Sequence, residues 1–202
     1  MFDVDAVPKD ISSVLVSDRV LKPLVRKVAG LRLPGAFDAF EVSVRAVVGQ
    51  QVSVKGATTV MGRIAERYGK RTGFGLVFPD AETLAQLDPE SLPMPGKRAL
   101  AIREMSSRIA EGVIRFDMEA QEFHSALLSV PGIGPWTADY IAMRALADPD
   151  AFLHGDLVIK KVASELFGID TEKELLARAE RWRPWRGYAG MHLWRYAAET
   201  RS

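Results

Sequence analysis

The stretch SVPGIGPWTADYIAMRALADPDAFLHGD, residues 129–156, holds the residues of this chain best suited to chemistry. Its PGIG turn allows a ligand to approach the backbone closely, because glycine carries no side chain. Pro135 follows the turn and is typical of the first position of a helix, where free amides attract an anion. We therefore expect a helix–hairpin–helix over residues 128–140 with an anion-binding turn, although the turn alone is equally consistent with an ordinary helix connection.

Two aromatic residues and one carboxylate follow this turn. Trp136 and Tyr140 are four residues apart, so they share one face of a helix, and two core aromatics are the common explanation for such a pair. Asp156 stands just before the apolar segment LVIKKV, where a carboxylate is a good helix N-cap. Taken by themselves, these residues predict local structure and leave a catalytic role open.

The elements that must position these residues are predicted to be helices, because nearly every periodic segment has apolar residues at helical spacing. We expect a linker over residues 31–35, a loop over 70–80, and helices over residues 10–29, 39–51, 53–69, 81–87, 97–112, 119–129, 135–147, 157–167, 171–181 and 184–199. The second of these segments is rich in β-branched residues and would also suit a strand. The predicted fold class is all-α, with about ten short helices in one bilobal domain over residues 1–202 and a cleft between the lobes.

Composition excludes several kinds of site. The chain has 202 residues and no cysteine, so disulfides, thiolate zinc sites and cysteine-ligated iron–sulfur clusters are excluded. Three scattered histidines make a histidine metal site unexpected. A net charge of +1 leaves the partner open, because a basic face can be balanced elsewhere. Without a membrane-spanning run or a signal peptide, we expect a cytoplasmic protein that does not associate with membranes.

Four motifs, in the same order, resemble those of the helix–hairpin–helix (HhH-GPD) DNA glycosylases. They are LRLPGAFDAFEVSVRAVVGQQVSVKGA, PGIGPWTADYIAMRAL, FLHGDLVIKK and AERWRPWRGYAGMHLW. The resemblance extends from about Asp18 to about Arg195 and is closest to the branch of the family that repairs alkylated bases. That branch carries a β-rich N-terminal domain, which we expect this chain to lack.

The resemblance implies roles for the residues of the opening stretch. Asp156 matches the family's catalytic carboxylate, which stabilises positive charge on the deoxyribose as the base leaves. Trp136, Tyr140 and Trp194 match aromatic residues that surround an extruded, positively charged base. Family members that also cut the DNA strand carry a lysine at the position of Trp136, so we expect water to be the nucleophile and no lyase activity.

Two positions depart from the pattern of the alkylation-repair branch. Gln51, preceded by Gln50 in the same turn, matches the wedge that fills the space left by the flipped nucleotide, where the branch has an apolar residue. Leu157 is expected to line the base pocket where the branch has an aromatic residue. The preferred opposite base and the range of damaged bases are therefore expected to differ.

Glycines leave the helix surface beside Trp194 bare. Gly190 and Gly187 lie one and two turns before Trp194. We expect this surface to leave space for a purine, although close helix packing would explain the glycines equally well.

The resemblance also implies contacts with the DNA backbone. The expected contacts are Gly132, Ile133, Gly134, Thr137, Lys160 and Lys161, and further cations that could bind phosphate are Arg181, Arg183 and Arg186. Each of these cations could equally be a solvated surface charge. Main-chain carbonyls of Leu128, Val130 and Ile133 are expected to hold a structural Na⁺ or K⁺.

The resemblance therefore predicts a monofunctional DNA glycosylase that acts as a monomer on damaged double-stranded DNA. It would flip alkylated purines, of the 3-methyladenine and 7-methylguanine type, and hydrolyse their N-glycosidic bond in base excision repair without a cofactor. In a bacterium it would associate with the nucleoid.

Three alternatives stay open. One is the same chemistry on another lesion, such as a deaminated purine. Another is a non-catalytic helix–hairpin–helix DNA-binding module, against which the register of Asp156 with the pocket aromatics argues. A third, an α-helical protein-interaction domain, predicts no salt-sensitive affinity for DNA.

Overall fold

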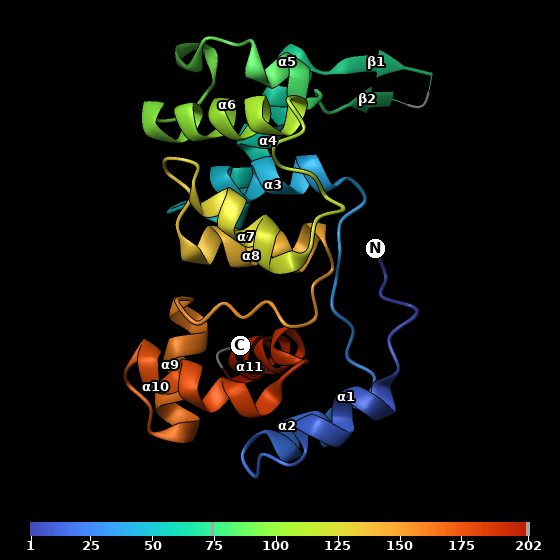
Figure 1. The fold of residues 1–202 in the computed structure, drawn as a ribbon, viewed down its shortest axis with the longest axis vertical. Helices are drawn as coiled ribbons and strands as arrows, with labels where there is room; N and C mark the ends of the chain where they lie inside the picture. The colour runs from blue at the N-terminus through green and yellow to red at the C-terminus, as the bar shows by residue number, and fades with distance from the viewer. Residues whose placement is uncertain (74, 201–202) are drawn as a thin grey trace. The chain divides into compact units, whose positions relative to one another are not determined.

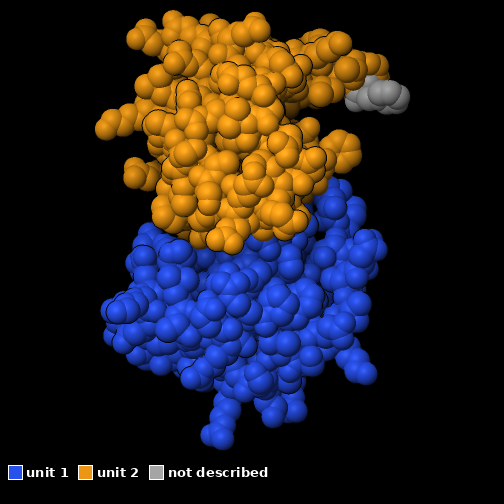
Figure 2. All heavy atoms as spheres, viewed as in Figure 1, with its two compact units in different colours: residues 1–35, 147–202 blue, residues 36–146 orange. Residues whose placement is uncertain are grey.

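The computed structural model describes residues 1–73 and 75–200, and within them it contains eleven α-helices, two 3-10 turns and a two-stranded sheet (Figure 1). The all-α prediction is confirmed. The chain divides into two compact units, coloured separately in Figure 2: unit 1 is residues 1–35 and 147–202, and unit 2 is residues 36–146. No helix of the described residues is long and apolar enough to cross a membrane.

Unit 2 is built on the packing of α8 against α3 and α7, and of α5 against α6. Its helices are α3 (Ala39–Val48), α4 (Val54–Tyr68), α5 (Ala81–Ala85), α6 (Gly96–Ala110), α7 (Ala120–Leu128) and α8 (Pro135–Ala145), with a 3-10 turn η1 (Pro89–Ser91). Side chains of Asp38, Ser53 and Asp80 cap three of these helices by accepting backbone N–H bonds. The buried core includes Val44, Val47, Ile64, Ile102, Met105, Phe123, Leu127 and Ile141.

The segment predicted as a loop over residues 70–80 contains the sheet. Strand β1 (Lys70–Thr72) pairs antiparallel with β2 (Gly75–Val77), and Lys70 lies opposite Val77. All six strand residues are exposed. The prediction missed the strands because the usual sequence signal of a half-buried strand, an alternation of apolar and polar residues, is absent here.

Unit 1 is organised around helix α11. Its elements are α1 (Pro8–Leu15), α2 (Leu21–Lys27), α9 (Leu157–Phe167), α10 (Glu172–Ala179), the 3-10 turn η2 (Glu180–Trp182) and α11 (Arg186–Thr200). Helix α11 packs against α9 and α2. The fully buried ring of Trp182 meets Phe152 edge-on, with 5.6 Å between ring centroids, and lies 5.8 Å from Phe167. These aromatic contacts join the loop before α9 to the segment before α11.

The N-terminal helix is broken where its apolar periodicity predicts one helix over residues 10–29. Helix α1 ends at Leu15 and α2 begins at Leu21. Between them, the Asp18 carboxylate accepts hydrogen bonds from the amides of Val20 and Leu21 at 2.9 and 3.3 Å. The prediction was wrong because a capping aspartate cannot be distinguished by sequence from a surface aspartate within a helix.

Candidate functional site

Asp156 is held by three hydrogen bonds to one carboxylate oxygen. It is the N-cap of α9, and its Oδ1 accepts from the amides of Val158 and Ile159 at 2.9 and 3.0 Å. The same oxygen accepts a hydrogen bond from the indole Nε1–H of Trp194 at 3.0 Å. The predicted N-cap is therefore confirmed. Donors from two helices, α9 and α11, fix the orientation of this carboxylate.

Trp194 makes a contact that sequence reasoning missed. The resemblance assigns its ring to the wall of a base pocket, whereas the structure shows its N–H bound to Asp156 from 38 positions away in the chain. Neither residue type nor spacing signals such a distant contact. Leu157, the predicted pocket residue next to Asp156, is the first residue of α9 and is 79% exposed.

The glycines of α11 allow close packing. A Cβ atom at Gly187 would lie 2.9 Å from the carbonyl oxygen of Pro149, and one at Gly190 would lie 3.5 Å from Cδ1 of Ile159. The Gly187 amide also donates a hydrogen bond to Pro149, at 2.8 Å. The interpretation of these glycines as space for a purine is therefore wrong, because the loop before α9 and α9 itself occupy that surface.

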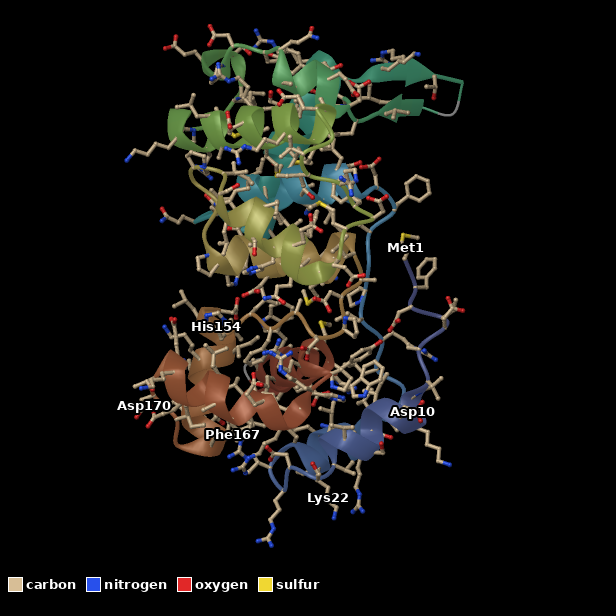
Figure 3. The ribbon with its side chains drawn as sticks, in the orientation of Figure 1. Met1, Asp10, Lys22, His154, Phe167 and Asp170 are labelled. Carbon is tan, nitrogen blue, oxygen red and sulfur yellow. The ribbon has the colours of Figure 1, made fainter. Side chains whose placement is uncertain are left out.

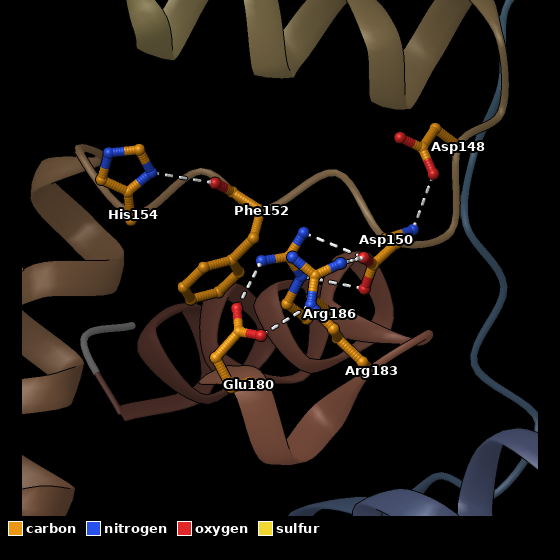
Figure 4. Close-up of polar contacts among 7 residues, drawn as sticks. All are labelled: Asp148, Asp150, Phe152, His154, Glu180, Arg183 and Arg186. Atoms are coloured by element: carbon orange, nitrogen blue, oxygen red, sulfur yellow. Dashed lines mark hydrogen bonds and ion pairs between the residues drawn. The ribbon is translucent and has the colours of Figure 1, made fainter. Parts of the chain in front are cut away.

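The loop that leads to Asp156 is anchored to α11 by charged side chains (Figure 4). The Asp150 carboxylate pairs with Arg183 and, at 2.8 and 2.9 Å, with Arg186. Glu180 pairs with the same two guanidinium groups, at 2.8 and 3.2 Å. The hydrogen bond from Arg183 lowers the pKa of the Glu180 carboxyl. Two carboxylates and two guanidinium groups thus hold the loop in one conformation, just before the catalytic candidate.

Several of the cations that were expected to contact phosphate in unit 1 are paired with carboxylates. Arg183 and Arg186 bind carboxylates of their own unit. Lys160 is also paired, with Glu172 at 2.9 Å. Lys161 and Arg181 are exposed. The charges of the three paired cations are offset locally, so they are weaker candidates for phosphate binding than their sequence positions indicate.

In unit 2, Trp136 and Tyr140 form a stacked pair on α8. Their ring centroids lie 5.4 Å apart with an interplanar angle of 18°, as their spacing predicts. The Arg144 guanidinium lies 5.5 Å from the centroid of the Tyr140 ring. Neither aromatic side chain is buried, so the explanation as two core aromatics does not hold. The pair offers a flat, partly exposed aromatic surface.

The hairpin between α7 and α8 has the predicted form. Gly132 adopts a φ of 93°, a left-handed conformation that favours glycine, and a Cβ there would approach Cβ of Ala101 to 3.0 Å. Ile133 is buried and its amide donates to the Val130 carbonyl at 3.1 Å. Gly134 is exposed and directly precedes α8. The turn therefore leads into a helix N-terminus at an exposed glycine, as an anion-binding hairpin requires.

Gln50 and Thr137 brace this hairpin. The Gln50 Nε2 donates to the Gly132 carbonyl and to the Thr137 hydroxyl, both at 3.0 Å. The Thr137 side chain is buried. The Gln50 amide is therefore used inside unit 2, which makes Gln50 a weaker wedge candidate than Gln51, and the contact of Thr137 with DNA stays a prediction.

Gln51 follows Gln50 in the turn between α3 and α4. Its φ is 57°, a left-handed conformation, and it is exposed. The guanidinium of Arg98 donates to the carbonyls of Val48 and Gln50, at 3.0 and 2.8 Å. These two hydrogen bonds fix the backbone of the turn. Because such a backbone conformation is unfavourable for a residue with a side chain, a rigid turn is needed to hold Gln51 there.

The predicted site residues are divided between the units. Asp156, Leu157 and Trp194 belong to unit 1, whereas Gln51, Trp136, Tyr140 and the hairpin belong to unit 2. Their assembly in one pocket, and the cleft between the lobes, stay predictions. Among the described residues, no group of three or more histidine, aspartate or glutamate side chains is placed to hold a metal ion.

Comparison with protein families gives two matches that together span most of the chain. Residues 44–187 match the HhH-GPD superfamily of base excision DNA repair proteins. Residues 1–38 match the AlkA N-terminal domain, a segment that contains α1 and α2 in the structure.

Curated relatives carry names from DNA repair. The chain is 40% identical over 201 residues to the "probable bifunctional transcriptional activator/DNA repair enzyme AlkA" of Mycobacterium tuberculosis, covering 96% of this chain and 40% of that protein. It is 37% identical over 202 residues to DNA-3-methyladenine glycosylase 2 of Escherichia coli, covering 96% of this chain and 68% of that protein. The chain thus spans well under half of the first relative and about two thirds of the second.

Solved structures share the fold. The 8-oxoguanine glycosylase/lyase of Clostridium acetobutylicum, in complex with double-stranded DNA, superimposes with a TM-score of 0.85 at 23% identity, covering 100% of this chain and 73% of that one. At this identity the likeness establishes the fold alone.

Proposed function

Because the chain belongs to the HhH-GPD superfamily of base excision DNA repair proteins, we propose that it is a DNA glycosylase that removes alkylated purines from duplex DNA. The observation that carries this proposal is Asp156, whose carboxylate is held by three N–H donors at the start of α9. The sequence resemblance matches Asp156 to the family's catalytic carboxylate. The names of the Mycobacterium tuberculosis and Escherichia coli relatives support the same class of reaction.

The chemistry requires little beyond this carboxylate. An adenine or guanine alkylated at N3 or N7 carries positive charge and is already a good leaving group, so a strong general acid is not needed. As the glycosidic bond breaks, positive charge develops on the deoxyribose. A carboxylate that is already oriented stabilises this charge without reorganising during the reaction. Water then adds to the sugar.

Recognition of the base and of the backbone falls to unit 2. The stacked surface of Trp136 and Tyr140 suits a cationic base, because electron-rich ring faces attract positive charge. Gln51 at the tip of its turn would fill the space vacated by the flipped nucleotide. Amides at the start of α8 would bind a backbone phosphate.

No cofactor is needed for this reaction. A monovalent cation at the hairpin would be held by the carbonyls of Leu128, Val130 and Ile133. The Val130 carbonyl already accepts the amide of Ile133, but a carbonyl oxygen has a second lone pair for a cation. The cation would help the hairpin to hold a phosphate.

We further propose that the enzyme lacks lyase activity. A lyase needs an amine that forms a Schiff base with the sugar, and Trp136 occupies the position at which strand-cutting relatives carry lysine. Borohydride should therefore trap no covalent complex between the protein and DNA from which the base has been released. A trapped complex would show that another amine serves as nucleophile.

The deciding experiment compares the wild type with Asp156→Asn for release of 3-methyladenine from methylated duplex DNA. Asparagine can still cap a helix but carries no charge, so we expect folding to be retained and base release to fall roughly 10²–10³-fold. Asp80→Asn is the matched control, because Asp80 also caps a helix, α5 in unit 2. This control should release base at the wild-type rate, with circular dichroism verifying the fold of both variants.

Other outcomes would identify a different function. Base release only from oligonucleotides with a deaminated purine would keep the chemistry and change the substrate. DNA binding without release of any tested base would indicate a non-catalytic DNA-binding module. Equal activity of Asp156→Asn and the wild type would remove the carboxylate from the mechanism.

A further inference from the structure

Unit 1 contains a hollow near the C-terminal end of α9, whereas Asp156 lies at the start of this helix. It has a volume of about 250 Å³ and is lined by Ser17, Asp18, Arg19, Arg178 and Arg181. The Arg178 guanidinium covers the ring of Phe167, 4.2 Å from its centroid. Phe167 ends α9, whereas Asp156 caps its start.

The hollow is therefore separate from the base-release site. His154 and Phe167 mark the two ends of the segment that contains α9 in Figure 3. At 1.5 Å per residue, the helix separates the ends by about 16 Å. The proposed bond-breaking step uses none of the residues of the hollow, and only Arg181 among them is also a predicted contact with the DNA backbone.

Asp18 is the one carboxylate among the described residues that line the hollow, and both of its oxygens accept hydrogen bonds. Oδ1 of Asp18 accepts from Nη2 of Arg178 at 2.8 Å and also caps α2, while Oδ2 accepts from the Trp182 indole at 3.0 Å. Burial raises the pKa of Asp18, but hydrogen bonds from Trp182 and Arg178 outweigh it and lower the pKa overall. Asp18 is thus ionised at neutral pH and offsets one of the three guanidinium charges.

Among the residues that the structure describes, the remaining guanidinium donors have no acceptor. Arg19 and Arg181 are exposed and make no hydrogen bond or ion pair with any residue that the structure describes. Nε of Arg178 is buried and likewise has no partner among the described residues. Each guanidinium offers five N–H donors in a fixed plane. Three arginines and one aspartate leave a local net charge of +2.

We propose that this hollow binds a dianionic phosphate, either inorganic phosphate or the terminal monoester of a nucleotide or DNA end. Guanidinium groups bind phosphate oxygens in pairs of parallel hydrogen bonds. A phosphate monoester carries about −1.5 to −2 charges at pH 7, which matches the local charge, whereas an internal DNA phosphodiester carries only one. A hollow of about 250 Å³ is large enough for several water molecules and therefore for a phosphate group.

The test is calorimetric titration of the full chain with sodium phosphate, with sodium chloride holding the ionic strength constant. We expect saturable binding that weakens about tenfold or more in the double variant Arg19→Gln/Arg181→Gln, because two charged donors are lost. Arg26→Gln is the matched control, since Arg26 is an exposed arginine of α2 outside the hollow. It should bind phosphate like the wild type. Equal binding by all three proteins, or no binding beyond that of chloride, would overturn the proposal.

Further titrations identify the source of the phosphate. Tighter binding of thymidine 5′-monophosphate, or of a duplex with 5′-phosphates over the same duplex without them, would assign a monoester. Tighter binding of inorganic phosphate would assign the free ion. The two duplexes could instead bind equally well, with both affinities lowered by the double variant. That result would overturn the proposal and assign the arginines to internal phosphates of the DNA backbone. Base release should be unchanged in the single variant Arg19→Gln, because Arg19 is not among the predicted DNA contacts, so failure here leaves the proposed function intact.

Discussion

One oxygen of Asp156 accepts three hydrogen bonds, and its carboxylate is also the proposed catalytic group. Hydrogen bonds to the amides of Val158 and Ile159 make it the cap of α9, and the indole of Trp194 adds a donor from α11. A cap alone needs no third donor, because the two amides already satisfy it. The indole therefore serves to orient the carboxylate, which makes Trp194 a positioning residue for the proposed reaction.

Trp194→Phe tests this role, because phenylalanine keeps an aromatic ring and loses the N–H. A hydrogen bond to a charged group contributes about 1.5 kcal/mol, so we expect single-turnover base release to slow about tenfold. Substrate KM should change little. Trp185→Phe, the same substitution just before α11, is the control and should keep the wild-type rate. An unchanged rate in Trp194→Phe would reduce the residue to a pocket wall.

We expect His192 to make the stability of the protein sensitive to acid. Burial, aided by the charge of Arg195, lowers the pKa of His192 to about 4. Because the unfolded chain binds a proton at a higher pH, near 6.5, the unfolded state takes up more protons between these values. Stability should therefore fall as the pH drops from about 6.5 to about 4, by up to roughly 3 kcal/mol.

Urea unfolding at several pH values checks this expectation against His192→Gln, which cannot titrate. The free energy of unfolding of the wild type should fall more steeply than that of the variant below about pH 6.5. Parallel curves for the two proteins would assign the acid sensitivity to other groups.

At the scale of elements, the loop before α9 has no regular structure and depends on α11 and η2. The network of Asp150, Arg183, Arg186 and Glu180 anchors its start, and buried Phe152 and Leu153 anchor its middle. Without these contacts, a loop of this kind would sample many conformations. The position of Asp156 is therefore decided as much by α11 as by the helix that it caps.

Asp150→Asn should loosen this loop. The variant leaves two guanidinium groups without their shared carboxylate, so we expect a loss of roughly 1–3 kcal/mol in unfolding free energy and faster amide hydrogen exchange over residues 147–155. Glu180→Gln is the matched control, because Glu180 is the more exposed carboxylate, with 56% of its side chain accessible against 19% for Asp150. Its effect should be smaller. Equal exchange in wild type and Asp150→Asn would show that apolar contacts alone hold the loop.

At the scale of the whole molecule, the proposed function requires that a net charge of +1 be distributed so that DNA can bind. Several cations near the site are paired with carboxylates, which leaves fewer to displace counterions from DNA. Lys161 is exposed next to the paired Lys160. We therefore expect the salt dependence of DNA binding to come from a small number of cations and from the hairpin.

Lys161→Gln should reduce the slope of log K against log salt by about 0.9, the value for one phosphate contact. Lys160→Gln should reduce it less, because Glu172 already offsets that charge. Fluorescence anisotropy with labelled duplex over a salt series measures both slopes. The opposite order would show that Lys160 exchanges Glu172 for phosphate.

The sequence by itself determined the features that depend on neighbours within one or two turns. Ser53 and Asp156 cap their helices, Pro135 begins α8, and Trp136 stacks on Tyr140, since each of these contacts lies within four residues. The all-α class follows from the same local periodicity. Family resemblance added the assignment of roles.

Only the tertiary structure decided the contacts between residues far apart in the chain. Trp194 binds Asp156 across 38 positions of the chain, and Gln50 binds Gly132 across 82. Asp150 pairs with Arg183 and Arg186, which from the sequence alone could equally bind phosphate. Such pairings depend on which helix faces pack together, and this cannot be predicted from residue type and spacing. The physical reason is that a side chain's local conformation depends on its near neighbours, whereas its partner depends on the packing of the whole core.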